Sequence, residues 1–422
     1  MKSMQLFLAL IAALPLQAAE LPIVTPEDVG FSSERLGEIT AFTRRDVDDG
    51  KLVGVVTMVA RKGKIVHFDA VGNYGLDNDK PIDKDALFRI YSMTKPITTV
   101  AMMMLYEEGK FQLGDPVSKH LPEFEHQKIV KDGELVAPER PMTIEQLMSH
   151  SAGLTYGFYG DHPVETAYQE SGLGDSKNLD EFVDILSGIP LRFEPGTRYH
   201  YSFATDVLGA IVERLSGLTL EEYFHSRIFA PLGMHDTFFN VPEDKLHRLA
   251  TNHYWEGEAE TIALIPEERA RPVTGVTLFS GGGGLISTAM DYMIFCEMLR
   301  NGGSYNGARI LGPKTVQYMT INHLTDEVRN EGLGEYPGSH LYPGQSFGLG
   351  FGVITDPGQA QVISSAGAYS WGGAANTKFW IDPEEDLVAI LMTQLLGSPW
   401  SDETRFNMKI ATYQALMELG AD

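Results

Sequence analysis

Apolar and polar positions alternate with two different periods in the first part of the chain. Residues 31–45 have the spacing of an amphipathic helix, with Ser32 or Ser33 in place to cap its start. The runs 52–60 and 64–72 are rich in β-branched residues and are separated only by an arginine, a lysine and a glycine. This pattern predicts a helix followed by an antiparallel hairpin, with which a sheet begins.

A more apolar segment covers residues 94–108 and stops at Gly109, as a buried helix with a terminal glycine does. Pro96 lies in its first turn, where a missing amide hydrogen has no partner in the helix, so we expect the helix to begin near Ser92. Helical patterns and loops then alternate over about residues 115–270. Strand-like runs return after them at residues 347–355, 377–383 and 386–394. A last helix is expected at residues 404–419.

Strand-like runs near both ends of the chain predict a sheet that is discontinuous in sequence. No repeat, low-complexity tract or Pro/Ser-rich linker divides the chain, so residues 20–422 are expected to form one catalytic domain of two interleaved lobes. An α/β lobe would take about residues 20–100 and 275–422, and a mainly helical lobe about residues 101–274. The expected fold class is therefore α+β.

The first 19 residues have the features of a signal peptide. Lys2 precedes an apolar stretch that is too short to span a membrane comfortably, and small residues follow at Ala18 and Ala19. No later run approaches the roughly 20 apolar residues that a spanning helix needs. We therefore expect cleavage near Ala18 or Ala19 and a soluble protein in the periplasm or outside the cell.

Charge and composition exclude several classes of partner. The chain has 57 acidic and 33 basic residues, and its formal net charge of −24 would repel nucleic acids and anionic lipid surfaces. Cys296 is the only cysteine, and its apolar helical surroundings predict a buried thiol rather than a nucleophile. The 12 histidines show no metal-binding spacing, and Gly281 to Gly284 lack the features of a phosphate loop, so no metal or cofactor is expected. These glycines are expected to shape a cleft wall, and His150 to order a loop.

The chemistry expected of this chain centres on Ser92 and Lys95. Residues three apart on a helix are neighbours on one face, about 5–6 Å apart, so the amine can reach the hydroxyl. A serine becomes a good nucleophile when a base takes its proton, and a lysine can be that base where apolar neighbours and a helix N-terminus favour its neutral form. Because a capping serine before a surface lysine also occurs by chance, this motif needs support from elsewhere in the chain.

Support comes from a second motif, in which a Pro-Gly turn precedes Tyr201 just ahead of a helical pattern. A phenol there can relay a proton between the nucleophile, the lysine and the leaving group. Tyr199 competes for this role. We expect Tyr199 instead to pack its ring and donate one hydrogen bond.

The third motif is Trp371-Gly372-Gly373, between two strand-like runs. Glycines at a strand edge permit close backbone approach, so the N–H of Ala374 is the candidate for half of an oxyanion hole, with the N–H of Ser92 as the other half. Trp371 would then wall the acyl pocket. Without the first two motifs, an ordinary tryptophan beside a glycine bulge would be the preferred interpretation.

With these motifs the chain resembles the serine β-lactamase and penicillin-binding-protein superfamily, and within it the family VIII carboxylesterases. The resemblance covers nearly all of residues 30–415 and also includes the stretches LMSHSAGL, FEPGTRYHYS, PLGMHDT and SGGGGLISTAMDYMIF. It implies a β-lactamase/transpeptidase-like fold, with an antiparallel sheet flanked by helices, a mainly helical lobe, and the active site in the cleft between them.

Two departures from the β-lactamase pattern concern the choice of substrate. Phe203 stands where penicillin-recognising members have the asparagine of Tyr-x-Asn, so a side-chain amide for the β-lactam is missing. Trp371 stands where they have the lysine of Lys-Thr-Gly, so an apolar wall replaces a cation for a carboxylate. Both changes favour uncharged esters.

The predicted function is hydrolysis of short-chain carboxylic esters through an acyl-enzyme at Ser92, with Lys95 and Tyr201 as general base and acid. A β-lactamase, a D-alanyl-D-alanine carboxypeptidase, an acyltransferase and a sensor that is acylated only once stay open as alternatives. Ser346 lies in a G-x-S-x-G motif, but a strand-like run follows it where an α/β-hydrolase has a helix, so we expect it to be structural. The natural ester and the oligomeric state are left open.

Overall fold

The computed structural model describes residues 21–131, 133–326, 328 and 341–420. The expected signal peptide, residues 1–19, lies outside the described residues.

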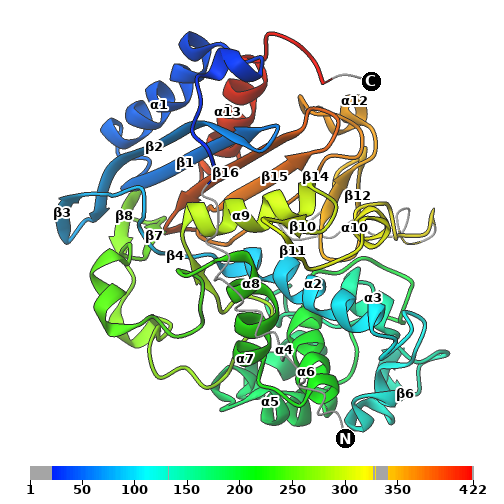
Figure 1. Cartoon of the computed structure of the whole chain (residues 1–422). Coiled ribbons are helices and arrows are strands. Elements are labelled where there is room, and N and C mark those ends of the chain that lie inside the picture. The colour runs from blue at the N-terminus through cyan, green and yellow to red at the C-terminus, as the bar shows by residue number, and fades with distance from the viewer. Residues whose placement is uncertain (1–20, 132, 327, 329–340, 421–422) are drawn as a thin grey trace, which may run out of the picture.

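An eight-stranded antiparallel sheet forms one part of the molecule (Figure 1). Its strand order is β12-β13-β14-β15-β16-β1-β2-β3, so the two ends of the chain meet where β1 pairs with β16, with Val55 opposite Thr393. This arrangement confirms the predicted hairpin and the predicted discontinuous sheet. The strands are β1 (Gly54–Arg61), β2 (Lys64–Gly75), β3 (Asn78–Pro81), β12 (Gln345–Phe347), β13 (Gly352–Ile354), β14 (Tyr369–Gly372), β15 (Lys378–Asp382) and β16 (Leu387–Thr393).

Helices cover both faces of this sheet because its central strands carry apolar side chains on both sides. On β1, Val55 and Val59 pack with the first and last helices, whereas Val56 and Met58 pack with the helices of the opposite face. Figure 1 shows α1 and α13 together on one side of the sheet and α9 and α2 on the other. These helices are α1 (Ser33–Asp48), α2 (Thr94–Glu107), α9 (Ala289–Arg300) and α13 (Ser401–Tyr413).

The middle of the chain forms a mainly helical part below the sheet in Figure 1, as the alternating patterns predict. Its helices are α3 (Ile144–Met148), α4 (Pro163–Glu170), α5 (Leu179–Ser187), α6 (Ala204–Ser216), α7 (Leu220–Phe224) and α8 (Ala230–Leu232). The smaller elements are β4 (Phe88–Arg89), β5 (Ile129–Lys131), β6 (Glu134–Val136), β7 (His253–Glu256), β8 (Thr261–Leu264), β9 (Ile286–Ser287), β10 (Ser304–Tyr305), β11 (Ala308–Arg309), α10 (Pro313–Met319), α12 (Pro357–Ala360) and β17 (Leu395–Leu396).

Two predicted elements differ from the structure. The run 347–355 is not one strand, because the chain turns between β12 and β13, and Gly350 has a φ of 90° in that turn. A Cβ at Gly350 would lie 2.1 Å from the hydroxyl oxygen of Thr99, so the turn needs a glycine on steric grounds as well. The last helix begins at Ser401 and ends at Tyr413, several residues short of the predicted end, because the chain then returns to pair Leu416 with Phe31.

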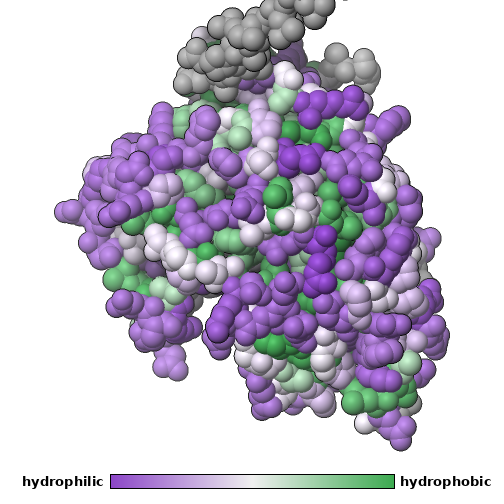
Figure 2. Space-filling model, turned by 60° about the horizontal axis from the view of Figure 1, so that its bottom comes forward, coloured by the Kyte–Doolittle hydropathy of each residue, from purple (hydrophilic) through white to green (hydrophobic). Residues whose placement is uncertain are grey.

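The surface carries no single dominant apolar region on the face that Figure 2 presents. Hydrophobic side chains form separate patches there among hydrophilic ones. Among the described residues, no helix combines the length and the apolar character needed to cross a membrane.

Candidate active site

Ser92 lies on a short 3-10 turn, Tyr91–Met93, directly ahead of α2. This position confirms the expected helix start near Ser92. Tyr91 has a φ of 44°, a left-handed conformation that costs a residue with a side chain on the order of 1–3 kcal/mol. The strain is held in place by burial of the Tyr91 ring and by Asn252, whose side-chain amide donates to the Tyr91 hydroxyl at 2.5 Å. The turn leaves the neighbouring Ser92 half-buried rather than enclosed.

Lys95 brings its amine to this hydroxyl from the first turn of α2. Its Nζ lies 3.2 Å from Ser92 Oγ, and the side chain is 1% exposed. The same Nζ donates to the carbonyl oxygen of Gly282 at 2.7 Å and lies 4.6 Å from the centre of the Tyr201 ring. The predicted serine, lysine and tyrosine thus come together in one place.

The buried carboxylate of Asp206, which the sequence did not single out, holds Gly282, the residue whose carbonyl oxygen accepts from Lys95. Asp206 in α6 is 3% exposed and accepts hydrogen bonds from Ser280 Oγ at 2.6 Å and from the Gly282 N–H at 3.0 Å. A Cβ at Gly282 would lie 2.3 Å from the Asp206 carboxylate, so the close fit requires the glycine. The glycine run therefore positions a carbonyl for the lysine, beyond shaping a wall. The signal available for Asp206 was its place in the first turn of the helix that follows Tyr201.

The hydroxyl of Tyr201 accepts a hydrogen bond from Trp371 Nε1 at 3.2 Å, so the second and third motifs meet directly. The hydroxyl of Tyr159 donates to the Tyr201 carbonyl oxygen at 2.8 Å and holds the backbone of that motif. Tyr199 is fully buried, as expected, and its hydroxyl has no hydrogen-bond partner among the described residues. Its ring instead packs against Phe347 and His150.

Aromatic rings surround the Lys95 amine on the side of the helical lobe. Tyr156 lies with its ring centre 5.5 Å from Lys95 Nζ and 4.4 Å from the ring centre of Phe203. Burial raises the pKa of Tyr156 well above its ordinary value, and nearby Tyr201 and Asp206 act in the same direction, so this phenol stays protonated. Tyr156 was missed in the sequence, although it follows directly on the LMSHSAGL stretch as TYGFY.

The end of β14 lies against the backbone that precedes Ser92. A Cβ at Gly373 would lie 2.4 Å from the carbonyl oxygen of Ile90, so only a glycine allows this approach. Neither the Ser92 amide nor the Ala374 amide donates a hydrogen bond within the described part of the chain. Ala374 is also exposed.

The other candidates are placed differently. Ser346 is fully buried within β12, and its hydroxyl donates to Asn322 Oδ1. Cys296 is fully buried in α9, and burial raises the pKa of its thiol. His150 orders a loop through its carbonyl oxygen, which accepts from the His200 N–H at 2.7 Å. Burial, with a smaller contribution from Lys95, lowers the pKa of His150 well below its ordinary value.

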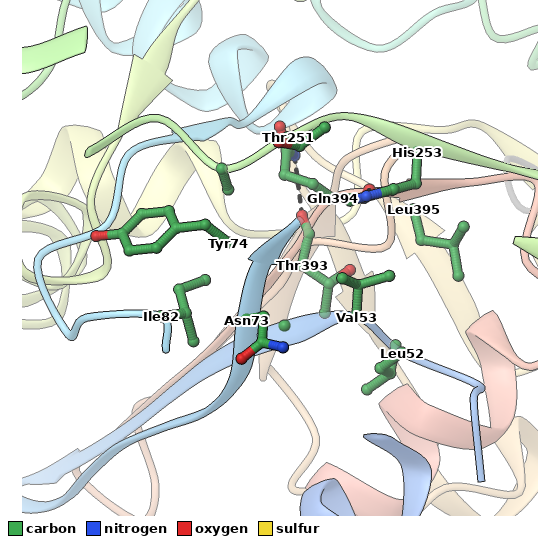
Figure 3. Close-up of a pocket in the computed structure, with 12 residues that line it drawn as sticks. Leu52, Val53, Asn73, Tyr74, Ile82, Thr251, His253, Thr393, Gln394 and Leu395 are labelled. Atoms are coloured by element: carbon green, nitrogen blue, oxygen red, sulfur yellow. Dashed lines mark hydrogen bonds between the residues drawn. The ribbon is translucent and has the colours of Figure 1, made fainter. Parts of the chain in front are cut away.

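A small cavity elsewhere in the molecule is distinct from this site. It lies where the sheet meets β7 and β17, with Tyr74 and Ile82 on one side and His253 and Leu395 on the other (Figure 3). Its volume is about 10 Å³, which is room for one water rather than for a substrate. Among the described residues, no group of three or more His, Cys, Asp or Glu side chains is placed to hold a metal ion.

Comparison with known proteins places this geometry in a family. The model of the Beta-lactamase family matches residues 39–411. Protein Rv1367c of Mycobacterium tuberculosis is 36% identical over 363 residues, which cover 84% of this chain and 88% of that protein. Esterase EstB of Burkholderia gladioli is 31% identical and is matched over 86% of this chain and 91% of its own length.

A solved structure agrees with the sequence comparisons. The structure of EstCE1, described as a hydrolase with promiscuous acyltransferase activity, is 27% identical and superimposes with a TM-score of 0.77, covering 90% of this chain and 99% of its own. The predicted β-lactamase/transpeptidase-like fold is thereby confirmed. From its motifs, its fold and these relatives, the chain belongs to the beta-lactamase family and is a serine hydrolase of that group.

Proposed function

We propose that this protein hydrolyses uncharged, short-chain carboxylic esters through an acyl-enzyme on Ser92. The observation that carries the proposal is the buried Lys95 amine, 3.2 Å from Ser92 Oγ. A second hydrogen bond, from Lys95 Nζ to the Gly282 carbonyl oxygen at 2.7 Å, holds the amine beside the serine hydroxyl. That arrangement suits a general base for the attack on a carbonyl carbon.

The remaining residues fit the later steps of this reaction. The N–H groups of Ser92 and Ala374 would bind the oxyanion that forms at the substrate carbonyl. Tyr201 would protonate the leaving alcohol, since its ring centre lies 4.6 Å from Lys95 Nζ and its hydroxyl accepts from Trp371 Nε1. Water activated by the same tyrosine and lysine would then release the acid and restore Ser92.

The pocket walls favour uncharged substrates. Trp371 and Phe203 present apolar rings where a cation and an amide would serve a β-lactam. The name of the relative EstB supports an esterase, and the acyltransferase activity ascribed to EstCE1 makes acyl transfer to an alcohol the second candidate. An added alcohol distinguishes the two, because a transferase yields the new ester in preference to the free acid.

The decisive experiment combines turnover with chemical labelling. Steady-state hydrolysis of p-nitrophenyl butyrate is expected for the natural chain and not for Ser92→Ala, whereas a chromogenic cephalosporin is expected to turn over poorly. A mechanism-based phosphonate should label the peptide that contains Ser92. A label on a different side chain, with Ser92 unmodified, overturns the proposal, and a single burst without turnover assigns the sensor instead.

We also propose that the protein is exported, on the strength of its first 19 residues. N-terminal sequencing of protein isolated from the periplasm or the medium should begin near Glu20. Recovery of the intact Met1 terminus from the cytoplasm alone would contradict it.

A further inference from the structure

A second cavity lies on the face of the sheet opposite α9, between α13 and strands β13 to β15. Its volume is about 190 Å³, far above the 10–15 Å³, roughly, that one water needs. Three cationic side chains line it, Lys378 from β15 and Arg405 and Lys409 from α13. Asp402 is the one carboxylate among its described lining residues. This excess of positive charge stands out in a chain with a net charge of −24.

The three cations have few anionic partners among the residues that the structure describes. Within the described residues, none of Lys378, Arg405 and Lys409 forms an ion pair with a carboxylate. The amine of Lys378 donates to the Ser370 hydroxyl at 3.3 Å. The Nε of Arg405 is buried and has no hydrogen-bond partner in the described part of the chain. Groups of this kind are costly when they lack an anionic partner, so a bound anion would relieve that cost.

The ionisation of the two lysines reflects the same imbalance. Burial lowers the pKa of Lys378 to about 7, and Arg405 and Lys409 contribute to this shift by repulsion. Burial lowers the pKa of Lys409 to about 8, against a smaller opposing effect of Asp382. Each amine is therefore ready to take up a proton when a negative charge arrives.

We propose that this cavity binds a small organic or inorganic oxyanion, a molecule with a carboxylate or phosphate group, between Lys378, Arg405 and Lys409. The planar guanidinium of Arg405 suits two oxygens of such a group, and the two amines add point charges from β15 and from the next turn of α13. Trp380 and Val353 line the cavity beside them and provide apolar surface for a short carbon skeleton.

The site is linked to the active site by Arg405. Its Nη2 donates to the carbonyl oxygens of Gly373 and Thr377, at 3.0 and 3.3 Å, and these residues bound the turn that presents the Ala374 amide. An anion that draws the guanidinium away from those carbonyls shifts the proposed oxyanion donor. This link rests on the function proposed above, whereas binding of the anion does not.

Binding is tested first, without substrate, by calorimetric titration of the full chain with sulfate, a phosphate mimic of constant charge, and with glutarate. Sodium chloride of equal ionic strength is the control. Saturable binding is expected, weakened about 10-fold or more in Lys409→Gln and in Lys378→Gln, as for loss of a charged hydrogen bond. The matched variant Lys177→Gln removes an exposed charge in the helical part and should bind as the natural chain does. Sulfate and glutarate distinguish a phosphate-type from a carboxylate ligand.

The pH dependence gives a second readout. Among the described residues, the charged groups that line the cavity are Lys378, Arg405, Lys409 and Asp402, and burial lowers the pKa of Lys378 to about 7 and that of Lys409 to about 8. Affinity for sulfate should therefore fall between about pH 6 and about pH 9. No saturable binding, or equal loss in Lys177→Gln, overturns the site. If binding is found but ester turnover is the same with and without saturating anion, the link through Arg405 is wrong while the site stands.

Discussion

Ser92 and Ser346 occupy two regions that the sequence presents as rivals. Each lies in a short motif associated with serine nucleophiles, S-x-x-K for Ser92 and G-x-S-x-G for Ser346. Ser346 is buried within a strand, and its hydroxyl donates a hydrogen bond to Asn322 Oδ1. Ser92 is half-buried on a strained turn, with a buried amine at hydrogen-bond distance. The difference shows that the surrounding backbone, more than the motif letters, decides whether a hydroxyl is placed for chemistry.

The largest expected effect separates these two serines directly. Ser92→Ala should lower kcat/KM for p-nitrophenyl butyrate by at least about 10⁴-fold, the scale on which loss of a nucleophile acts. Ser346→Ala should stay within a few-fold of the natural chain. Comparable losses in both variants would mean that Ser346 has a part in the chemistry that its burial gives no reason to expect.

Removing either of the proposed proton-transfer groups, Lys95 or Tyr201, should have the next largest effect. Lys95→Met and Tyr201→Phe are each expected to lower kcat by about 10²–10⁴-fold, the usual contribution of a general acid or base. Pre-steady-state release of p-nitrophenol distinguishes the two steps, because a residue needed only for deacylation leaves the burst intact. Normal turnover in Lys95→Met would contradict the contrast drawn between Ser92 and Ser346, since Ser92 would then react without the neighbouring amine.

Asp206 tests whether the lysine needs its supporting carbonyl. Asp206→Asn keeps the shape of the side chain but weakens the bonds to Ser280 and Gly282, and we expect a loss of about 10- to 100-fold in kcat, as for a misplaced catalytic group. Asp184→Asn, an exposed change in α5, is the matched control and should leave kcat unchanged.

Trp371→Phe tests the hydrogen bond from Trp371 Nε1 to the Tyr201 hydroxyl. The apolar wall is kept while the Nε1–H that donates to Tyr201 is lost, so a decrease of about 10-fold in kcat with a small change in KM is expected, in line with one hydrogen bond to a charged or reacting group. A change confined to KM would instead assign Trp371 to substrate binding alone.

The smallest effect on activity belongs to Ser346, whose contribution should appear in stability. Ser346→Ala removes one of two donors to Asn322 Oδ1, which also accepts from the Leu324 N–H at 3.0 Å, so the free energy of unfolding should fall by about 0.5–1.5 kcal/mol in urea titrations. Ser92→Ala should be neutral or stabilising, since a strained functional turn is not built for stability. If both variants lose equal stability, the contrast between the two sites is weaker than their geometry indicates.

Local patterns predicted most of the elements that carry the site. The apolar run after Ser92 predicted α2 to within a residue, and the expected cap of α1 is present, since Ser32 Oγ accepts from the Arg35 N–H at 3.3 Å. The turn that breaks the run 347–355 was missed, because its glycine is required by Thr99, far away in sequence. Long-range fits of this kind have no local signal.

The residues of the active site also divide into those with a local sequence signal and those without one. Ser92, Lys95 and Tyr201 carry reactive groups at recognisable spacing, so the sequence alone identified them as candidates. Asp206 and Tyr156 act through contacts that exist only after α6 and the loop before α4 have packed against α2, and little in their own neighbourhood distinguishes them from helix-surface or loop residues.

The pairing of β1 with β16 has a consequence for how the chain acquires its fold. The inner edge of the first hairpin has no partner until Leu387–Thr393 are available, so the sheet cannot be completed while the last tenth of the chain is still being made. Until then β1 presents an apolar strand edge of the kind that pairs with other chains. A product cut short before Leu387 should therefore aggregate rather than remain as a partly active enzyme.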